Sequence, residues 1–496
     1  MEKNIKAELF EFVPRADTPE VPTSPGSYSS FGKALSKFIR RPLAIVPLAV
    51  IALIVLFSIL VPVFVTRPPT YMDPYYAKKG PRSAWLSENV GIMHGEATRS
   101  FGEAGMISLY AIGIGAYDKT GEGVAPNTDM SGYSPLISFT KSGDRYRAVV
   151  DSYLEVGFIY MTVTEGEYLE MLEYEKNTGV ELLYPLIAEN EYSPARPDAN
   201  IWYRTDSRGR AIDENGDLLD FSDDIALVDN YLRNEAGEPI YSVYSGGGSL
   251  ESAGRKVRTL YYNYYLYKNG TRPDYIMGTD SQGYDLAQRL AGGVRLSLLI
   301  ALAVSLINLT LGALVGAVEG YYGGVVDLSL ERITDVLSGV PFIVVATLFQ
   351  IHLASSVGAI PSLLFAFVLT GWIGTAKRVR AQFYRFKNSE YVLAARTLGA
   401  SDGRIIWRHI FPNTLGTLIT ASALVIPGVI FSESMLSFLG IVNLGGSEMT
   451  SLGTLLSEAG SIWTSFPHLI FYPALFVSLL MISFNLLGNQ LREALA

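Results

Sequence analysis

The side chains that most often perform chemistry are thinly spread along this chain of 496 residues. Its four histidines, His94, His352, His409 and His468, are far apart and show none of the short spacings that bind a metal. We find no nucleophile–base pair and no phosphate-binding loop, because the glycines and lysine of 371–377 have the wrong spacing. We therefore predict a protein that is not an enzyme and binds no metal or cofactor itself. A hydrolase is the enzyme-class alternative.

One acidic side chain has an unusual place. Glu433 lies in the second half of the apolar run 415–440. A carboxylate inside a membrane is costly and usually faces protein or a water-filled cavity. Glu433 is therefore a candidate for lining a translocation path, where it would sense an amino group. The alternative is a helix-packing hydrogen bond near one end of the membrane span.

The segment 390–413 has the features of a docking surface. Its first part is rich in helix formers, and Gly399 suits a helix C-terminus. A second helical stretch is expected from Asp402, a suitable N-cap, to Pro412. Two short helices joined at a glycine would form a flat knob that fits the groove of another protein. The alternative is a basic loop that only satisfies membrane topology.

The composition indicates which class of protein must position these residues. Hydrophobic residues make up 49% of the chain and charged residues only 18%, below the roughly 25% charged residues of soluble domains. The mean hydropathy is +0.24, the formal net charge is −9, and there is no Cys. These values exclude a disordered chain, a disulfide-stapled scaffold and a basic nucleic-acid binder. They indicate a membrane protein with a large water-soluble part.

Six apolar runs are suited to crossing a lipid bilayer, which takes about 20 residues. Gly312, Gly316 and Gly320 recur every four residues in the second run, a spacing that lets two helix backbones pack closely. Simple glycine richness is the alternative explanation. Pro341 is expected to kink the third run. The predicted spans are residues 42–65, 296–318, 336–354, 360–376, 415–440 and 467–487.

Positive charge sets the expected orientation of these spans. Lys33, Lys37, Arg40 and Arg41 precede the first span, and the positive-inside rule places them in the cytoplasm. Six crossings then place both termini in the cytoplasm. The predicted parts are a cytoplasmic segment 1–41, a first span 42–66, an extracytoplasmic domain 67–280, and a membrane core 281–496 with a cytoplasmic loop at about 377–413.

Residues 67–290 form an acidic block, with 21 Lys and Arg against 33 Asp and Glu. The block is too long for a bare loop and too apolar for disorder. Strands are predicted at 155–164 and 180–186, with a helix between them that starts after Thr164 in a capping box. Further predictions are hairpins between 200 and 270 and a strand at 261–267. Their turns are expected at Asn215-Gly216, Ala236-Gly237 and Asn269-Gly270, and the whole indicates an inserted α+β domain.

From Gly278 to the C-terminus the sequence resembles a known family, the C-type permease subunits of dipeptide, oligopeptide and nickel ABC importers. Three positions depart from that family, because Leu393 replaces its Glu, Phe411 replaces its usual Leu, and Tyr284 replaces an Arg that is often present. The matching motifs are Gly278-Thr279-Asp280, Arg289, Leu296-Ser297-Leu298, Gly320-Tyr321, Asp327, Asp335, Pro341, Ala394-Ala395, Gly399, Pro412, Ser437-Phe438-Leu439-Gly440 and Phe484-Asn485-Leu486-Leu487-Gly488.

The resemblance implies a fold, partners and a site. The fold would be the type I ABC importer transmembrane fold with six spans, in the inner membrane of the cell. The partners would be a second homologous permease subunit, an extracytoplasmic substrate-binding protein, and two ATP-binding subunits that hold ATP and Mg. The residues expected to face the ATPase are Tyr391, Ala394, Ala395, Arg396, Gly399, Ala400 and Ser401.

The expected function is to form the translocation path for short peptides in an ATP-driven importer. The alternatives are the same machinery for nickel chelates or oligosaccharides, and a membrane-anchored sensor or envelope-interaction protein that reuses the permease core. The inserted domain is expected to be a docking platform for the substrate-binding protein. Covering the outer mouth of the path and contacting another envelope component are the alternatives for that domain.

Overall fold

The computed structural model describes residues 42–65, 67–118, 130, 132–188, 198–221, 225–245, 254–446 and 450–495, so the predicted segment 1–41 lies outside the described residues. The chain divides into two compact units. The membrane-core unit comprises the chain up to Val55, Ser297–Leu436 and Val477–Ala496. The inserted unit comprises Leu56–Leu296 and Ser437–Phe476.

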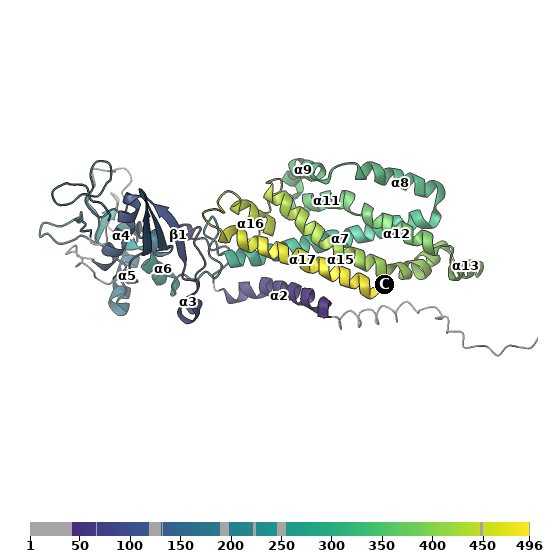
Figure 1. Ribbon diagram of the computed structural model, residues 1–496, viewed down its shortest axis with the longest axis horizontal. Coiled ribbons are helices and arrows are strands. Elements are labelled where there is room, and N and C mark those ends of the chain that lie inside the picture. Colours follow the sequence, from purple (N-terminus) through teal and green to yellow (C-terminus); the bar gives the residue numbers. More distant parts are fainter. Residues whose placement is uncertain are drawn as a thin grey trace, which may run out of the picture. The chain divides into compact units, whose positions relative to one another are not determined.

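Helices make up most of the described chain outside the insertion (Figure 1). Four of the described helical segments are long and apolar enough to cross a membrane, and six are if two bent helix pairs each count as one span. The helices are α2 (Pro42–Phe64), α7 (Leu286–Tyr322), α8 (Gly324–Ser338), α9 (Phe342–His352), α10 (Ala354–Val357), α11 (Ala359–Gly371), α12 (Ile373–Phe386), α13 (Glu390–Thr397), α14 (Asp402–Arg404), α15 (Phe411–Phe438), α16 (Leu452–Ala459) and α17 (His468–Leu495).

The third predicted span has the wrong bounds. Residues 336–354 do not form one helix, because α8 ends at Ser338 and α9 begins at Phe342, and the two helices are bent by 75°. Pro341 precedes the first residue of α9, which confirms the predicted kink at this proline. Proline has no backbone N–H to donate to the preceding turn, so a new helix starts after it.

The fourth predicted span ends too early. The helix continues as α12 to Phe386, through residues that were assigned to the loop at 377–413. Ala376, Val379 and Phe383 recur at helical spacing and are buried. This apolar stripe keeps the segment helical although its other faces are basic.

Three glycines of α7 lie against α12 in the membrane-core unit. A Cβ added to Gly312 would lie 2.6 Å from Cβ of Thr375, and one added to Gly316 would lie 2.9 Å from Cβ of Val379. A Cβ on Gly320 would lie 2.5 Å from Cβ of Phe383. Both partners advance by four residues in the same direction, so α7 and α12 run parallel. Only glycine permits the two helices to approach this closely.

The described residues of the inserted unit form two antiparallel sheets of three strands each, with orders β1-β3-β2 and β4-β6-β5. Helix α4 (Glu103–Tyr117) supplies many buried side chains to the main core of this unit. Trp202 donates its indole N–H to the carbonyl oxygen of Ala111 in α4, at 2.8 Å. The strands are β1 (Glu96–Phe101), β2 (Leu136–Ser142), β3 (Arg145–Asp151), β4 (Phe158–Val163), β5 (Ser242–Ser245) and β6 (Gly254–Leu260).

Part of the predicted α+β pattern is confirmed. Strand β4 lies within the predicted 155–164, and α5 (Glu165–Thr178) follows it. The Thr164 hydroxyl accepts the N–H of Glu167 at 3.2 Å, as the capping box requires. The turns at Asn215-Gly216 and Ala236-Gly237 are also confirmed, each within an isolated antiparallel bridge.

Three predictions for the inserted unit are wrong. Residues 180–186 touch β6 through one isolated bridge, between Tyr184 and Arg258, and form no strand. Residues 261–267 belong to α6 (Tyr261–Asn269), and Asn269-Gly270 ends that helix instead of turning a hairpin. The tyrosines favour a strand by propensity, but Tyr261 and Tyr265 are one helical turn apart and both are buried. Tertiary packing therefore overrides β propensity.

Candidate functional site

The segment between α13 and α14 is a compact turn of the membrane-core unit. The N–H of Gly399 donates to the carbonyl oxygen of Arg396, and the N–H of Ala400 donates to that of Ala395, both at 3.0 Å. Gly399 has a φ of 82°. These two bonds and the left-handed glycine form a Schellman motif, which satisfies the end of α13 and turns the chain sharply into α14.

The turn exposes a large apolar side chain. Leu398 immediately precedes the glycine and is 88% exposed, and Leu393, Tyr391 and Trp407 are also exposed. Sequence reasoning missed Leu398 and Trp407 as surface residues of the knob. The spacing gave no signal for this, because Leu398 follows Ala395 by three residues, as Ala395 follows Val392, and would continue the buried stripe if the helix did not end there.

The predicted docking residues do not all reach this surface. The exposed ones are Tyr391, Ala394, Arg396, Gly399 and Ser401. Ala395 is buried and Ala400 is half-buried, so both support the turn from below. The predicted N-cap of the second helical stretch is wrong by one residue, because Ser401 takes that position and Asp402 is the first helical residue.

The base of the turn is fixed to the core of the same unit. Tyr321, the penultimate residue of α7, donates its hydroxyl to Asp402 Oδ1 at 2.5 Å. Arg396 donates to the Tyr321 hydroxyl oxygen at 3.3 Å. Val392 and Ile405 are fully buried in a cluster with side chains of α7 and α12. The base of the turn is therefore joined by side-chain contacts to both α7 and α12.

The second helical stretch does not end at Pro412, contrary to the prediction. Residues Ile405–Ile410 form a π-helix that leads directly into α15. Pro412 then lies in the first turn of α15, where its missing N–H removes no hydrogen bond from within the helix. Such π segments are rare and occur often at functional sites.

Glu433 of α15 is 1% exposed in the membrane-core unit. Its Oε2 accepts a hydrogen bond from the Ser297 hydroxyl of α7 at 3.1 Å. The Ser434 hydroxyl lies 3.5 Å from the same oxygen. This geometry favours the helix-packing role over the path-lining role in this conformation.

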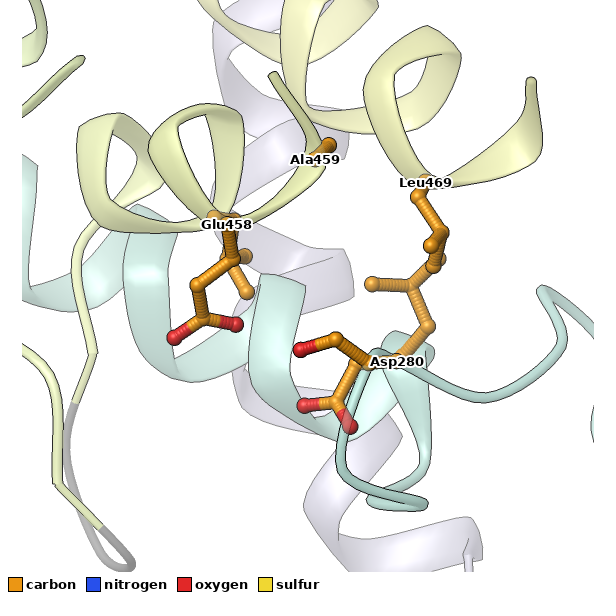
Figure 2. Close-up of a pocket in the computed structure, with 7 residues that line it drawn as sticks. Asp280, Glu458, Ala459 and Leu469 are labelled. Atoms are coloured by element: carbon orange, nitrogen blue, oxygen red, sulfur yellow. The ribbon is translucent and has the colours of Figure 1, made fainter. Parts of the chain in front are cut away.

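The inserted unit holds a small pocket with two carboxylates in a mostly apolar lining beside α16 (Figure 2). Its empty space is about 190 Å³, including the open mouth. Pockets that hold small molecules usually measure about 300–1,000 Å³, so this pocket is too small for a peptide. The lining residues are Asp280, Ser281, Leu286, Leu455, Glu458, Ala459 and Leu469.

An ion-pair triad borders this pocket, with Arg289 and Asp280 buried and Glu458 half-buried. Arg289 of α7 is 6% exposed and lies 3.2 Å from Asp280 Oδ2 and 3.0 Å from Glu458 Oε1. The same guanidinium donates to the carbonyl oxygen of Gly446 at 2.9 Å. Burial raises the pKa of the Glu458 carboxyl above its usual range, and the opposing effect of Arg289 is smaller. The triad ties α16 to the start of α7.

Comparison with known families gives two matches. Residues 308–496 match the model of the binding-protein-dependent transport system inner membrane component. Residues 29–81 match the model of the N-terminal TM domain of oligopeptide transport permease C. The two matched ranges lie on either side of the sheets and the helices α3 (Ala84–Val90) to α6.

Individual relatives agree with these matches. The dipeptide transport system permease protein DppC of Bacillus subtilis is 40% identical over 228 residues, which are 45% of this chain and 68% of the relative. The oligopeptide transport system permease protein OppC of Haemophilus influenzae is 40% identical over 223 residues, 45% of this chain and 70% of the relative. One solved structure, the inward-facing MetNI methionine ABC transporter, aligns with a TM-score of 0.36 at 15% identity and covers 42% of this chain and 98% of that chain.

The motifs at the α13–α14 turn, the apolar helices and these matches define a class of membrane protein. The chain belongs to the family of binding-protein-dependent inner-membrane permeases, and within it to the dipeptide and oligopeptide permease C group. More than half of this chain lies outside the alignments with the two relatives.

Proposed function

We propose that this chain forms the translocation path for short peptides in an ATP-driven importer. Its relatives are named as dipeptide and oligopeptide permeases, and the 40% identity over 68% of the Bacillus protein carries the proposal. The complex would contain a second homologous permease subunit, two ATP-binding subunits with ATP and Mg, and an extracytoplasmic substrate-binding protein. Hydrolysis would take place on the ATP-binding subunits.

The turn between α13 and α14 is the proposed contact with the ATPase. The knob would insert Leu398 into a groove of an ATP-binding subunit, and Tyr391 and Trp407 would flank it. Closure of the two ATP-binding subunits would move the knob. Because Tyr321 and Asp402 join its base to α7, that movement would shift the long helices between inward- and outward-facing states.

We propose six spans, with both termini in the cytoplasm and residues 67–280 outside. The parallel packing of α7 and α12 supports this order, because the second and the fourth span must cross in the same direction. The basic residues of α12, among them Arg378 and Arg385, then lie at the cytoplasmic end of the fourth span, as the positive-inside rule requires. The two bent helix pairs would count as the third and the fifth span.

We propose that the inserted domain is a docking platform for the substrate-binding protein. Its length and its own core are those of a folded module rather than a loop. The test replaces residues 96–269 by a short Gly/Ser linker and keeps the main-chain pairing of Arg82 with Tyr275. A docking platform predicts normal uptake at high concentrations of the binding protein and loss of uptake at low concentrations. Unchanged uptake at both concentrations would assign the domain to a role outside transport.

Uptake by whole cells tests the choice of substrate. Deletion of this gene, with the ATPase genes intact, should abolish uptake of labelled di- to pentapeptides, and the wild-type gene should restore it. Competition with nickel chelates and with oligosaccharides separates the alternative substrates. Normal uptake of all three classes in the deletion strain would favour a sensor or an envelope-interaction protein.

A further inference from the structure

Exposed large apolar side chains are concentrated in the part of the inserted unit that follows α2. Six of them are exposed on residues 72–92 and on Ile276, whereas the described residues between 94 and 275 expose eight over a far longer stretch. We call these six the apolar collar. Trp85 of α3 (Figure 1) is the most exposed at 66%. The collar residues are Met72, Tyr75, Trp85, Val90, Ile92 and Ile276.

The collar is held at the end of α2. That helix ends at Phe64, and the guanidinium of Arg67 lies 3.2 Å from Asp285 Oδ2, next to the first residue of α7. Three residues span at most about 10 Å, so this ion pair lies close to the outer end of α2. The ion pair therefore holds the end of α2 close to the start of α7, so that the two ends would lie at a similar depth in a membrane.

Main-chain hydrogen bonds then hold the segment that carries the collar close to the start of α7. The N–H of Asp73 donates to the carbonyl oxygen of Gly283 at 3.1 Å, and Arg82 and Tyr275 exchange two bonds of 2.9 Å. The N–H of Leu286, which begins α7, donates to the carbonyl oxygen of Gly278 at 3.1 Å. The segment that carries α3 is therefore paired with the run that leads into α7.

The residue types fit a lipid surface. Trp and Tyr concentrate at membrane–water boundaries, where the ring is embedded and its polar edge meets water. Val63 and Phe64, at the end of α2, are 73% and 75% exposed, so a spanning α2 would turn apolar side chains to lipid a few residues before the collar begins in the sequence. We propose that the collar lies in the headgroup region of the outer leaflet and anchors the inserted domain on the bilayer.

This proposal rests on α2 and α7 crossing the membrane, which belongs to the proposed function, and its test separates the two. The chain has no Cys, so single cysteines can carry a nitroxide label in the full complex in lipid nanodiscs. Val90→Cys tests the collar, and Leu169→Cys on α5 is the matched control, because both native side chains are 56% exposed. Val63→Cys reports whether α2 itself meets lipid.

The label at Val90 should be reached by oxygen more readily than by a water-soluble nickel complex, with a depth close to the lipid phosphates. The label at Leu169 should behave as a water-exposed site. Equal nickel accessibility at Val90 and Leu169, with Val63 in lipid, would overturn the collar proposal. A water-exposed Val63 would instead contradict the proposed spans. Protection of Val90 only after addition of the binding protein would assign the collar to a protein partner, and Ile92→Cys replaces Val90→Cys if that variant fails to assemble.

Discussion

At the scale of single residues, the turn after α13 depends on the left-handed conformation of Gly399. Any other L-residue there costs roughly 1–2 kcal/mol, but no atom lies within 4 Å of a Cβ at this position. We expect the Gly399→Arg variant to insert into the membrane normally and to lose its peptide uptake, because the added side chain covers the knob. Uptake and membrane content of the variant are measured together.

Gly216 offers a matched control for that substitution. It also has a left-handed φ, of 90°, and open space around its Cβ position, but it lies at a turn of the inserted unit. Gly216→Arg should therefore carry the same backbone strain and keep uptake. Normal uptake by Gly399→Arg would refute the coupling role of the turn.

The triad at Arg289 predicts a large loss of stability when its cation is removed and little change when the charge of Glu458 is removed. Arg289→Met leaves the carboxylates of Asp280 and Glu458 facing each other in a buried site, and we expect a loss of about 3–5 kcal/mol of stability. Glu458→Gln removes the excess negative charge and should change stability little at neutral pH. Thermal unfolding of the detergent-solubilised protein measures both, and equal losses would contradict this arrangement.

The pH dependence of the same site follows from the raised pKa of Glu458. The usual pKa of this carboxyl is 4.5, and folding raises it, so its contribution to stability is complete below pH 4.5. That contribution is lost as the pH rises through the raised value in the folded protein. Glu458→Gln should remove this part of the pH dependence of the melting temperature, and an unchanged pH profile would contradict the assignment.

At the scale of elements, the sequence predicted the existence of helices better than their ends. The apolar runs predicted α2, α7, α15 and α17 from composition alone. The sequence did not predict that α12 continues to Phe386. Burial of one apolar stripe keeps this basic segment helical, and the local sequence does not show which helix buries that stripe. The strand predicted at 261–267 was wrong for the same reason, since the burial of the tyrosines of α6 depends on residues far away in the sequence.

The close contact of α7 with α12 can be tested by overpacking. Gly316→Leu should push the two helices apart, because a Cβ at this position would lie 2.9 Å from Val379, and we expect a loss of about 1–3 kcal/mol. Gly428→Leu in α15 is the control, since no atom lies within 4 Å of its Cβ position. Equal thermal stability of the two variants would show that the glycines do not set the packing.

The link between the knob and α7 predicts a separate defect. Tyr321→Phe removes the hydroxyl that Asp402 accepts, and a hydrogen bond to a charged group contributes about 1.5–3 kcal/mol. ATP hydrolysis by the complex should persist while uptake per ATP falls severalfold. Tyr322→Phe is the control, because Tyr322 is exposed beside it. Equal coupling in both variants would argue against force transfer through Tyr321.

At the scale of the whole molecule, the family was identifiable from ordered motifs in the C-terminal half. Those motifs also located the turn after α13, but they did not reveal that Leu398 is its most exposed apolar residue. The inserted unit was predictable as a folded α+β domain and not in its topology. In one of its sheets β6 lies between β4 and β5 and pairs with β4, more than 90 residues earlier in the chain, and such long-range pairing leaves no local signal.

The proposed topology makes a direct prediction for chemical labelling. A membrane-impermeant thiol reagent should label Leu169→Cys in right-side-out vesicles and Leu398→Cys only in inverted vesicles. The native chain gives no background, because it has no Cys. Labelling of both positions from one side would exclude an odd number of crossings between them.

The most direct test of the account is peptide transport by the complete purified complex in proteoliposomes. Wild-type complex supplied with ATP and the substrate-binding protein should accumulate labelled peptide against its gradient. Complex with Gly399→Arg should bind the same peptide-loaded protein and transport nothing, and Gly216→Arg should transport normally. Accumulation by Gly399→Arg at the wild-type rate, or none by the wild type with any short peptide, would contradict the proposed function.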